Sequence, residues 1–245
     1  MQIIRGKNNG DVYTISLFVS LATMFLGPFI FMIPMLVILS ANDPNFAFTI
    51  DYLLSPDFIK ANMILEFIAD IIPIALTVVI FRKVLALDFR KFKNNFAKYS
   101  LMIVLGFVAI IVFGNIISII YELLGITGDS ANQSVIESAL RSNARPFMFI
   151  MIVFFAPFFE EMIFRKFLIG TLVEKMRLNK WIVFTISAVL FAGIHVIGDP
   201  ASWVFFFQYL VLSVIITLSY IISSYNIYVP IGIHLLNNLL SFLLT

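Results

Sequence analysis

FMFIMIVFFAPFFEEMIFRKFLIGT, residues 147–171, is apolar at almost every position except for a charged group near its middle. A helix that crosses a hydrocarbon core of about 30 Å needs roughly 20 mostly apolar residues. The length and composition of this stretch therefore predict a transmembrane helix. The charged group inside that helix needs a separate explanation.

The composition of the whole chain agrees with a lipid environment. Of its 245 residues, 61% are hydrophobic and 12% are charged, and the mean hydropathy is +1.04. Soluble domains carry about 25% charged residues, so a water-soluble fold would leave large apolar patches exposed. The net charge of +2 offers no nucleic-acid footprint, and the lack of cysteine excludes disulfides, thiol catalysis and cysteine-ligated metals. We expect a membrane protein that is embedded in the lipid bilayer and has the lipids as partners.

Seven stretches are long and apolar enough to be read as membrane spans. An open chain in lipid has to satisfy its own backbone hydrogen bonds, so all seven are expected to be α-helices. We predict an all-α, polytopic transmembrane bundle that forms one integrated domain, with three accessory spans in residues 1–146 and four spans in residues 147–245. The predicted spans are residues 15–39, 60–82, 99–124, 147–171, 181–197, 202–224 and 228–244.

The distribution of Lys and Arg predicts the orientation of the bundle. All but three of the 16 cations fall in the N-terminus or in the connections after the second and fourth spans, where Arg165 and Lys166 are counted. The positive-inside rule then places the N-terminus in the cytoplasm and the C-terminus outside, in a multi-pass protein of the cell membrane. The first span is expected to be retained, because no signal-peptide cleavage site follows it. The basic segment 83–98 is interpreted as an ordinary loop, with an amphipathic helix on anionic headgroups as the alternative.

Glu160, Glu161 and Arg165 form the charged group of the fourth span. Ionisable side chains inside lipid are costly, and they mark functional sites by default. At about 100° per residue, Glu161 and Arg165 lie one turn apart on the same side, where we predict an ion pair. Glu160 points about 100° away and has no partner on its own helix, which leaves it for acid–base chemistry. The structural alternative is that both glutamates only hold helices together.

Two further spans carry polar residues at membrane depth. His195 ends the sequence FAGIH in the fifth span, and His234 and Asn238 share a face at i,i+4 in the seventh, with Asn237 beside them. Aligned donors of this kind suit an oxyanion hole, whereas interhelical hydrogen bonding is the structural alternative. A glutamate, two histidines and an asparagine on different helices form a hydrolase-type constellation, which activates water and polarises a carbonyl group.

Glu66 and Asp70 in the second span also lie at i,i+4, just before Pro73. We interpret them as a bundle-facing pair reached by interfacial water, with a proton or ion relay as the alternative. A secondary transporter is a weak interpretation of the whole chain, because no internal repeat relates its two halves.

The three polar motifs resemble those of the CPBP family of intramembrane proteases, the CAAX-processing and bacteriocin-immunity group that is also called the Abi family. That family has EExxxR on one helix, FxxxH on the next and HxxxN or HxxxB on a later one. This chain has Glu160 to Arg165, Phe191 to His195 and His234 to Asn238 in the same order. The resemblance implies that residues 147–245 are a catalytic core. It also implies peptide-bond hydrolysis within the membrane, at a site that opens toward the cytoplasm.

The resemblance implies four catalytic residues and two supporting ones. The catalytic residues are Glu160, His195, His234 and Asn238. The first two would activate the water, and the last two would stabilise the oxyanion. Glu161 and Arg165 would hold the site together.

Cofactor and substrate are less well defined by the motifs. We expect glutamate-activated water with no cofactor, although Glu160, His195 and His234 are alternatively a His₂Glu zinc site. The expected substrate is a small peptide or the terminus of a membrane protein, in a bacterial plasma membrane. The rival interpretation is a non-catalytic membrane protein for bacteriocin immunity or sensor-kinase regulation, whose partner is a bacteriocin or a membrane sensor.

Overall fold

The computed structural model describes residues 9–42, 49, 56–140 and 145–244, and within these ranges the chain is almost entirely helical, with no β-strand. In chain order the elements are α1 (Asn9–Asn42), α3 (Pro56–Asn94), α4 (Phe96–Leu123), α5 (Ala131–Leu140), α6 (Arg145–Ile150), η1 (Met151–Phe155), α7 (Ala156–Glu161), η2 (Met162–Leu168), η3 (Thr171–Lys175), α8 (Lys180–Ile194), η4 (Pro200–Phe205), α9 (Phe206–Ile222) and α10 (Tyr228–Leu244).

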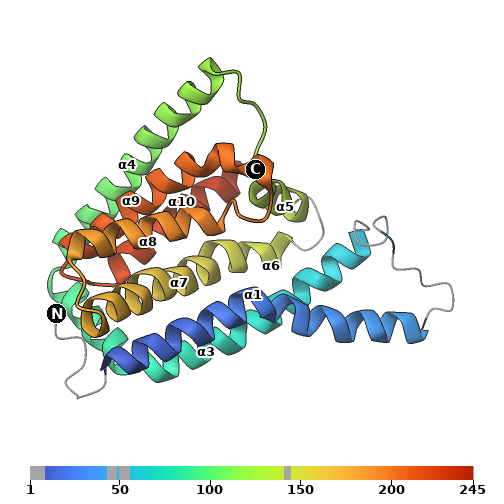
Figure 1. Cartoon of the computed structure of the whole chain (residues 1–245), viewed down its shortest axis with the longest axis horizontal. Coiled ribbons are helices and arrows are strands. Elements are labelled where there is room, and N and C mark those ends of the chain that lie inside the picture. Colours follow the sequence, from blue (N-terminus) through green and yellow to red (C-terminus); the bar gives the residue numbers. More distant parts are fainter. Residues whose placement is uncertain (1–8, 43–48, 50–55, 141–144, 245) are drawn as a thin grey trace.

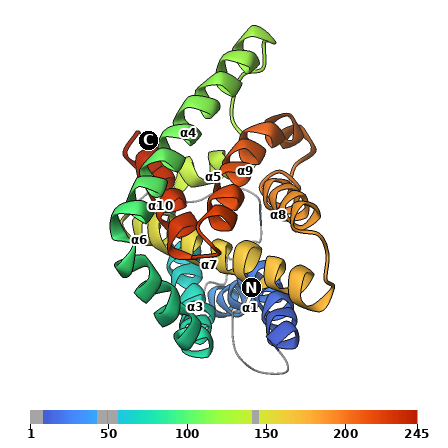
Figure 2. The same ribbon diagram turned by 90° about the vertical axis from the view of Figure 1, so that its left-hand side faces the viewer.

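A long helical rod, from α6 through η3, runs through the middle of the bundle (Figures 1 and 2). The pair α1 and α3 packs along one side of this rod, where α1 contacts η2 and η3. On the other side α8 contacts η2, α10 contacts η1 and α7, and α9 packs against both α8 and α4. The rod contains the stretch that carries the charged group, so those side chains lie in the centre of the protein.

Each of the seven predicted spans overlaps a helix, which confirms the predicted all-α membrane bundle. Among the described residues, α8 and α10 are apolar but have only 15 and 17 residues, or about 23 and 26 Å at 1.5 Å per residue. The number of spans and their orientation stay predictions. Within the described ranges, four helical stretches are long and apolar enough to cross a membrane, namely Gly10–Ala41, Phe96–Leu123, Arg145–Lys175 and Pro200–Ile222.

Two predicted boundaries are wrong. Residues 83–98 were interpreted as a loop, but α3 continues to Asn94 and α4 begins at Phe96. This segment is rich in Leu, Phe and Lys and contains no Gly or Pro to end a helix. His195 was placed inside the fifth span, but it lies directly after Ile194, the last residue of α8, as the C-cap.

The central rod contains three wider, π-helical turns, η1, η2 and η3. Pro157 gives a physical reason for the first of them, because a proline has no N–H to donate to the preceding turn. π-Helical turns of this kind occur frequently at functional sites. Here they flank α7, the short α-helical segment that ends with the two adjacent glutamates.

Two glycines allow α10 to lie close to α4. A methyl group added to Gly232 would come within 2.6 Å of Cδ1 of Ile103, and one added to Gly106 would collide with Ile233. Small residues permit such close helix contacts in membranes. Since His234 directly follows Ile233, this contact fixes which face of α10 is turned toward the rod.

Candidate active site

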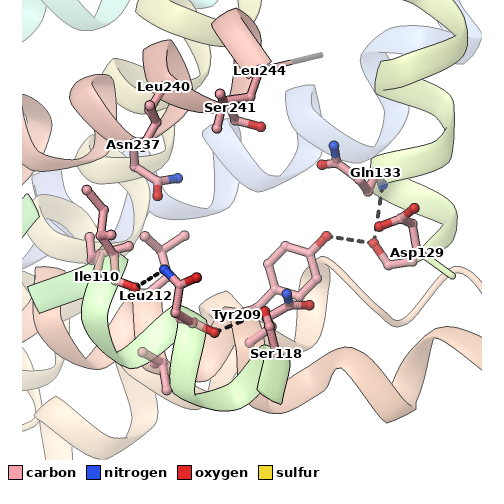
Figure 3. Close-up of a pocket in the computed structure, with 16 residues that line it drawn as sticks. Ile110, Ser118, Asp129, Gln133, Tyr209, Leu212, Asn237, Leu240, Ser241 and Leu244 are labelled. Atoms are coloured by element: carbon pink, nitrogen blue, oxygen red, sulfur yellow. Dashed lines mark hydrogen bonds between the residues drawn. The ribbon is translucent and has the colours of Figure 1, made fainter. Parts of the chain in front are cut away.

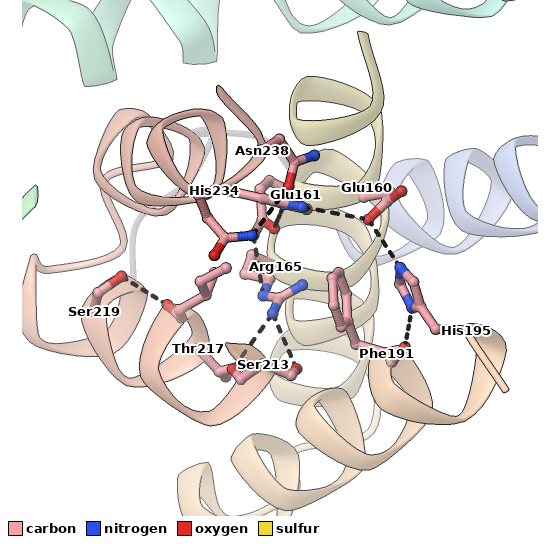
Figure 4. Close-up of polar contacts among 12 residues, drawn as sticks. Glu160, Glu161, Arg165, Phe191, His195, Ser213, Thr217, Ser219, His234 and Asn238 are labelled. Carbon is pink, nitrogen blue, oxygen red and sulfur yellow. Dashed lines mark hydrogen bonds and ion pairs between the residues drawn. The ribbon is translucent and has the colours of Figure 1, made fainter. Parts of the chain in front are cut away.

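The six predicted site residues lie together where the central rod meets α8 and α10 (Figure 4). The two glutamates end α7, and the arginine lies in η2. The first histidine caps α8, while the second histidine and the asparagine lie one turn apart in α10. In chain order they are Glu160, Glu161, Arg165, His195, His234 and Asn238.

Glu161 is the centre of a fully buried polar network. Its Oε2 atom lies 3.1 Å from Nε of Arg165, which confirms the predicted ion pair, and its Oε1 atom lies 2.8 Å from Nδ1 of His234. Arg165 donates from Nη2 to Oγ of Ser213 at 3.1 Å, and its guanidinium carbon lies 4.4 Å from the centre of the Phe191 ring. Both charged side chains are 0% exposed. Buried charges of this kind persist only when paired, so the removal of one partner is costly.

Glu160 faces away from this network, toward two imidazoles. Its Oε2 atom lies 3.8 Å from Nε2 of His195 and 4.0 Å from Nε2 of His234. These distances are too long for direct hydrogen bonds, and no residue of the described ranges is hydrogen-bonded to this buried oxygen. Polar atoms separated by more than about 3.5 Å are commonly bridged by water. The oxygen and the two nitrogens thus frame a position for one water molecule.

The second nitrogen of each histidine determines where its proton lies. Nδ1 of His195 is 2.7 Å from the carbonyl oxygen of Phe191, and because a carbonyl oxygen only accepts, Nδ1 donates. Nδ1 of His234 faces the carboxylate of Glu161, which is paired with Arg165, and so it donates too. We infer from these partners that a neutral imidazole directs the Nε2 lone pair toward Glu160, whereas a protonated one directs an N–H there.

Asn238 is partly engaged by the backbone. Its amide nitrogen donates to the carbonyl oxygen of Ile152 at 2.9 Å, and its Oδ1 atom accepts from Asn237 at 3.2 Å. The Ile152 carbonyl lies five residues before Pro157, which has no N–H for a π-type hydrogen bond. Asn238 therefore replaces a missing backbone donor. An amide nitrogen has two N–H groups, so the predicted oxyanion role depends on the second one.

A cavity of about 260 Å³ separates the six residues into two groups. Four of them line the cavity, namely Glu160, His195, His234 and Asn238. Glu161 and Arg165 lie behind these four, in the buried network. The same division follows from the family resemblance, which implies four catalytic and two supporting residues.

Sequence reasoning missed two residues of α9. The ring of Tyr209 stacks on His195, with 4.7 Å between ring centres, and its hydroxyl is 2.7 Å from Oγ of Ser130. Ser213 accepts the hydrogen bond from Arg165 described above. The sequence does contain a signal for them, since Tyr209, Ser213 and Thr217 recur at four-residue spacing in a mostly apolar helix.

A second buried ion pair was also missed. Nζ of Lys166 lies 2.6 Å from Oδ2 of Asp88, and Lys166 is 1% exposed. The backbone carbonyl of Asp88 accepts a hydrogen bond from Asn226 at 2.8 Å. The prediction that Lys166 belongs to a cytoplasmic loop is therefore wrong. The pair joins residues 78 positions apart, and no local spacing rule finds such a contact.

In the alternative zinc site, Oε2 of Glu160 lies further from the two histidine nitrogens than zinc ligands lie from one another. Ligand atoms around a tetrahedral zinc ion lie roughly 3.3 Å from one another. The Oε2 atom of Glu160 is 3.8 and 4.0 Å from the nitrogens of His195 and His234. Within the described ranges, no group of three or more His, Cys, Asp or Glu side chains is placed to hold a metal ion. The spacing is closer to that of a bridged water.

Some predictions fall on residues that the structure leaves undescribed. Glu66 and Asp70 both lie in α3, but the side chain of Glu66 is outside the described part, so their pairing stays a prediction. The N-terminal cations Arg5 and Lys7 are outside it as well.

Comparison with known proteins places the chain in a family. Residues 142–240 match the model of a family described as type II CAAX prenyl endopeptidase Rce1-like. A curated protein of Lactococcus lactis subsp. lactis (strain IL1403), named UPF0177 protein YbdI, is 32% identical over 135 residues, which are 53% of this chain and 68% of the relative. The chain belongs to the CPBP family.

Membership of the CPBP family confirms the resemblance drawn from the three motifs. The matched range begins before Glu160 and ends after Asn238, so it contains all six site residues of the CPBP pattern. No solved structure matches the chain at a significant level.

Proposed function

We propose that this CPBP protein is an intramembrane peptidase that hydrolyses a peptide bond in a small peptide or in the terminus of a membrane protein. The position of Glu160 carries the proposal. Its unpartnered carboxylate oxygen lies between two imidazole nitrogens in a cavity within the bundle. The match to the CAAX prenyl endopeptidase family supports peptide hydrolysis as the class of reaction. The apolar helices support a location in a membrane, and the Lactococcus relative supports a bacterial one.

The proposed reaction begins with the water between these three atoms. Glu160 takes a proton from the water while the water oxygen attacks the carbonyl carbon, and Nε2 of His195 accepts a hydrogen bond that orients the nucleophile. A positioned general base contributes about 10²- to 10⁴-fold in rate. When the tetrahedral intermediate collapses, the C–N bond breaks and Glu160 passes the proton to the leaving amine. The products are a carboxylic acid and an amine.

The developing negative charge on the carbonyl oxygen is stabilised by side chains of α10. Nδ1–H of His234 is held by Glu161, so Nε2 donates to the oxyanion in the form that carries both ring protons. The second amide N–H of Asn238 provides another donor. One such donor contributes about 10²- to 10³-fold. Glu161 and Arg165 act through His234, as positioning residues.

The two ends of the bundle differ in charge and in their distance from the cavity, and this difference indicates the side from which the substrate arrives. The connections α3–α4 and η3–α8 lie at one end, together with the start of α10 (Figure 1). The cavity is lined from α5, the first half of α9 and the second half of α10, which lie toward the opposite end. The cations at the first end are Lys91, Lys93, Lys98, Lys175, Arg177 and Lys180.

The charge-based orientation disagrees with the cytoplasmic opening that the family resemblance implies. The positive-inside rule places the basic end in the cytoplasm, so the cavity lies nearer the outer side. We propose the outer side for substrate entry, because the charge bias is a property of this chain, whereas the cytoplasmic opening was implied by the family resemblance alone.

The opening is testable because the chain has no cysteine. Gly198 lies in the α8–α9 connection with open space where a Cβ atom would be. A Gly198→Cys protein should react with a membrane-impermeant maleimide on intact cells. The matched control, Lys180→Cys at the basic end, should react only after lysis. The reverse pattern would place the cavity on the cytoplasmic side.

The peptidase activity is tested with purified protein and a panel of membrane-anchored peptide reporters, with the products identified by mass spectrometry. Glu160→Gln should lower the cleavage rate about 10²- to 10⁴-fold, and the variant should still fold. Glu122→Gln, at the exposed end of α4, is the matched control and should cleave like the wild type. Wild-type cleavage by folded Glu160→Gln protein would contradict the proposal and favour the non-catalytic interpretation.

A further inference from the structure

A second cavity of about 440 Å³ adjoins the catalytic one (Figure 3). It lies between α4, α9 and α10, next to the start of α5. The two cavities are adjacent, because five residues line both of them. These shared residues are Gln133, Tyr209, Leu212, Asn237 and Ser241.

The lining of the second cavity is rich in neutral polar groups. Asn115 and Ser118 contribute from α4, Gln208 from α9 and Asn237 from α10. Of the residues that line it, Asp129 alone carries a charged side chain. This lining has no cation to hold a phosphate. Side-chain amides both donate and accept hydrogen bonds, as peptide groups do.

A peptidase inside a membrane has to supply hydrogen-bond partners to the backbone of its substrate, and this lining contains such groups. The segment around the scissile bond has to leave its helix, because the intrahelical hydrogen bonds cover its carbonyl groups. At membrane depth each unsatisfied backbone N–H or C=O then costs several kcal/mol. Amide and hydroxyl groups along the cavity wall offer replacements, with Asn115 and Ser118 each already donating once to a carbonyl oxygen of α4. The volume lies within the range of about 300–1,000 Å³ that is typical of ligand sites.

Tyr209 lies between the second cavity and the catalytic side chains. Its ring stacks on His195, and its hydroxyl lies 2.7 Å from Ser130, which lines the second cavity. A chain that leaves the second cavity past Tyr209 arrives beside His195 and Glu160. The adjoining cavity is thus placed to hold residues on one side of the scissile bond.

We propose that the second cavity binds the extended backbone of an uncharged substrate segment directly adjacent to the scissile bond. The proposal rests on the proposed peptidase function and adds a substrate class, namely a neutral polypeptide tail recognised through its backbone. Asn115 and Gln208, which line the second cavity and not the catalytic one, are the specificity-determining residues.

Kinetics of a double variant test the binding. An Asn115→Leu/Gln208→Leu protein removes two hydrogen-bonding groups, which should raise KM about tenfold for a reporter whose tail reaches the cavity, while kcat stays near wild type. A reporter shortened on that side should be cleaved equally by both proteins. Phe113→Leu, on the opposite face of α4, is the matched control. Equal KM values for the long reporter would overturn the proposal.

Cross-linking tests the same site without any need for activity. In a Glu160→Gln background, Asn115→Cys creates the single thiol of the chain. The probe is a peptide with an apolar span and a neutral extended tail, in which one cysteine is moved along the tail. A disulfide should form within one short window of tail positions. The control Phe113→Cys should form none.

The two proposals fail in different ways. Wild-type cleavage by the Glu160→Gln variant contradicts the peptidase function, whereas the cross-linking result still reports on the cavity. No cross-link from Asn115→Cys, or the same cross-linking from Phe113→Cys, overturns peptide binding in the second cavity.

Discussion

Glu160 and Glu161 are neighbours in the chain, but they belong to two different regions of the molecule. Glu161 belongs to the region toward the basic end, where it forms an ion pair with Arg165 and accepts a hydrogen bond from His234. Glu160 belongs to the region toward the opposite end, where two adjoining cavities lie and its own oxygen has no partner in the described ranges.

Packing follows the same division. Met162, Ile163 and Phe167, on the rod toward the basic end, are 0% exposed, as is Ile227 before α10. The Asp88–Lys166 pair lies within this closed part. The side chains of Glu160 and His195 are 15% and 14% exposed by contrast. Paired charges hold the bundle together at one end, and an unpaired carboxylate is left for chemistry at the other.

Arg165→Ala should have the largest effect on stability. It leaves Glu161 buried without its cation and weakens the hold on His234, so we expect a loss of about 3–5 kcal/mol together with loss of cleavage. Thermal unfolding in detergent measures the loss. Glu160→Gln is the comparison, because it should lose cleavage and keep its Tm. An unchanged Tm for Arg165→Ala would show that the ion pair does not stabilise the fold.

Lys166→Met separates stability from chemistry. It leaves Asp88 without its buried partner and should cost about 3 kcal/mol, but Lys166 does not line either cavity, so cleavage per folded molecule should stay near wild type. The double variant Asp88→Leu/Lys166→Met should recover part of the stability, since no charge is then left unpaired. A fall in kcat for well-folded Lys166→Met protein would mean that the two regions are coupled.

Asn238→Leu tests a residue that lies between the two regions. The Ile152 carbonyl loses its donor, which should cost about 1–3 kcal/mol of stability. Loss of the second amide N–H should lower kcat about 10²- to 10³-fold with little change in KM. Unfolding curves and steady-state kinetics separate the two effects. A stability loss with unchanged kcat would make Asn238 a helix-packing residue alone.

Of these changes, metal removal should have the smallest effect on the cleavage rate. Because the donor atoms at Glu160 are spaced for a bridging water, cleavage by the wild-type protein should be the same before and after treatment with a chelator. The measurement is the reporter-cleavage rate, with zinc added back as the control. Loss of cleavage that zinc restores would favour the His₂Glu site.

Local contacts in this protein were predictable, and long-range ones were not. The Glu161–Arg165 pair depends only on helix periodicity, and it lies where the i,i+4 rule places it. The Asp88–Lys166 pair and the Tyr209–His195 stack depend on how distant helices cross. Those crossings are set by side-chain shape, as at Gly106 and Gly232, and a single sequence does not specify them by any spacing rule.

The amino-acid sequence alone determined the helical membrane fold and the six polar residues at membrane depth, because apolar length and helix periodicity are local properties. It also determined the charge bias between the two ends. Tertiary structure alone decided that Glu160 faces both imidazoles and that His234 donates to Glu161. It also decided that the cavities lie away from the basic end, since a cavity forms where the packing of several helices leaves space.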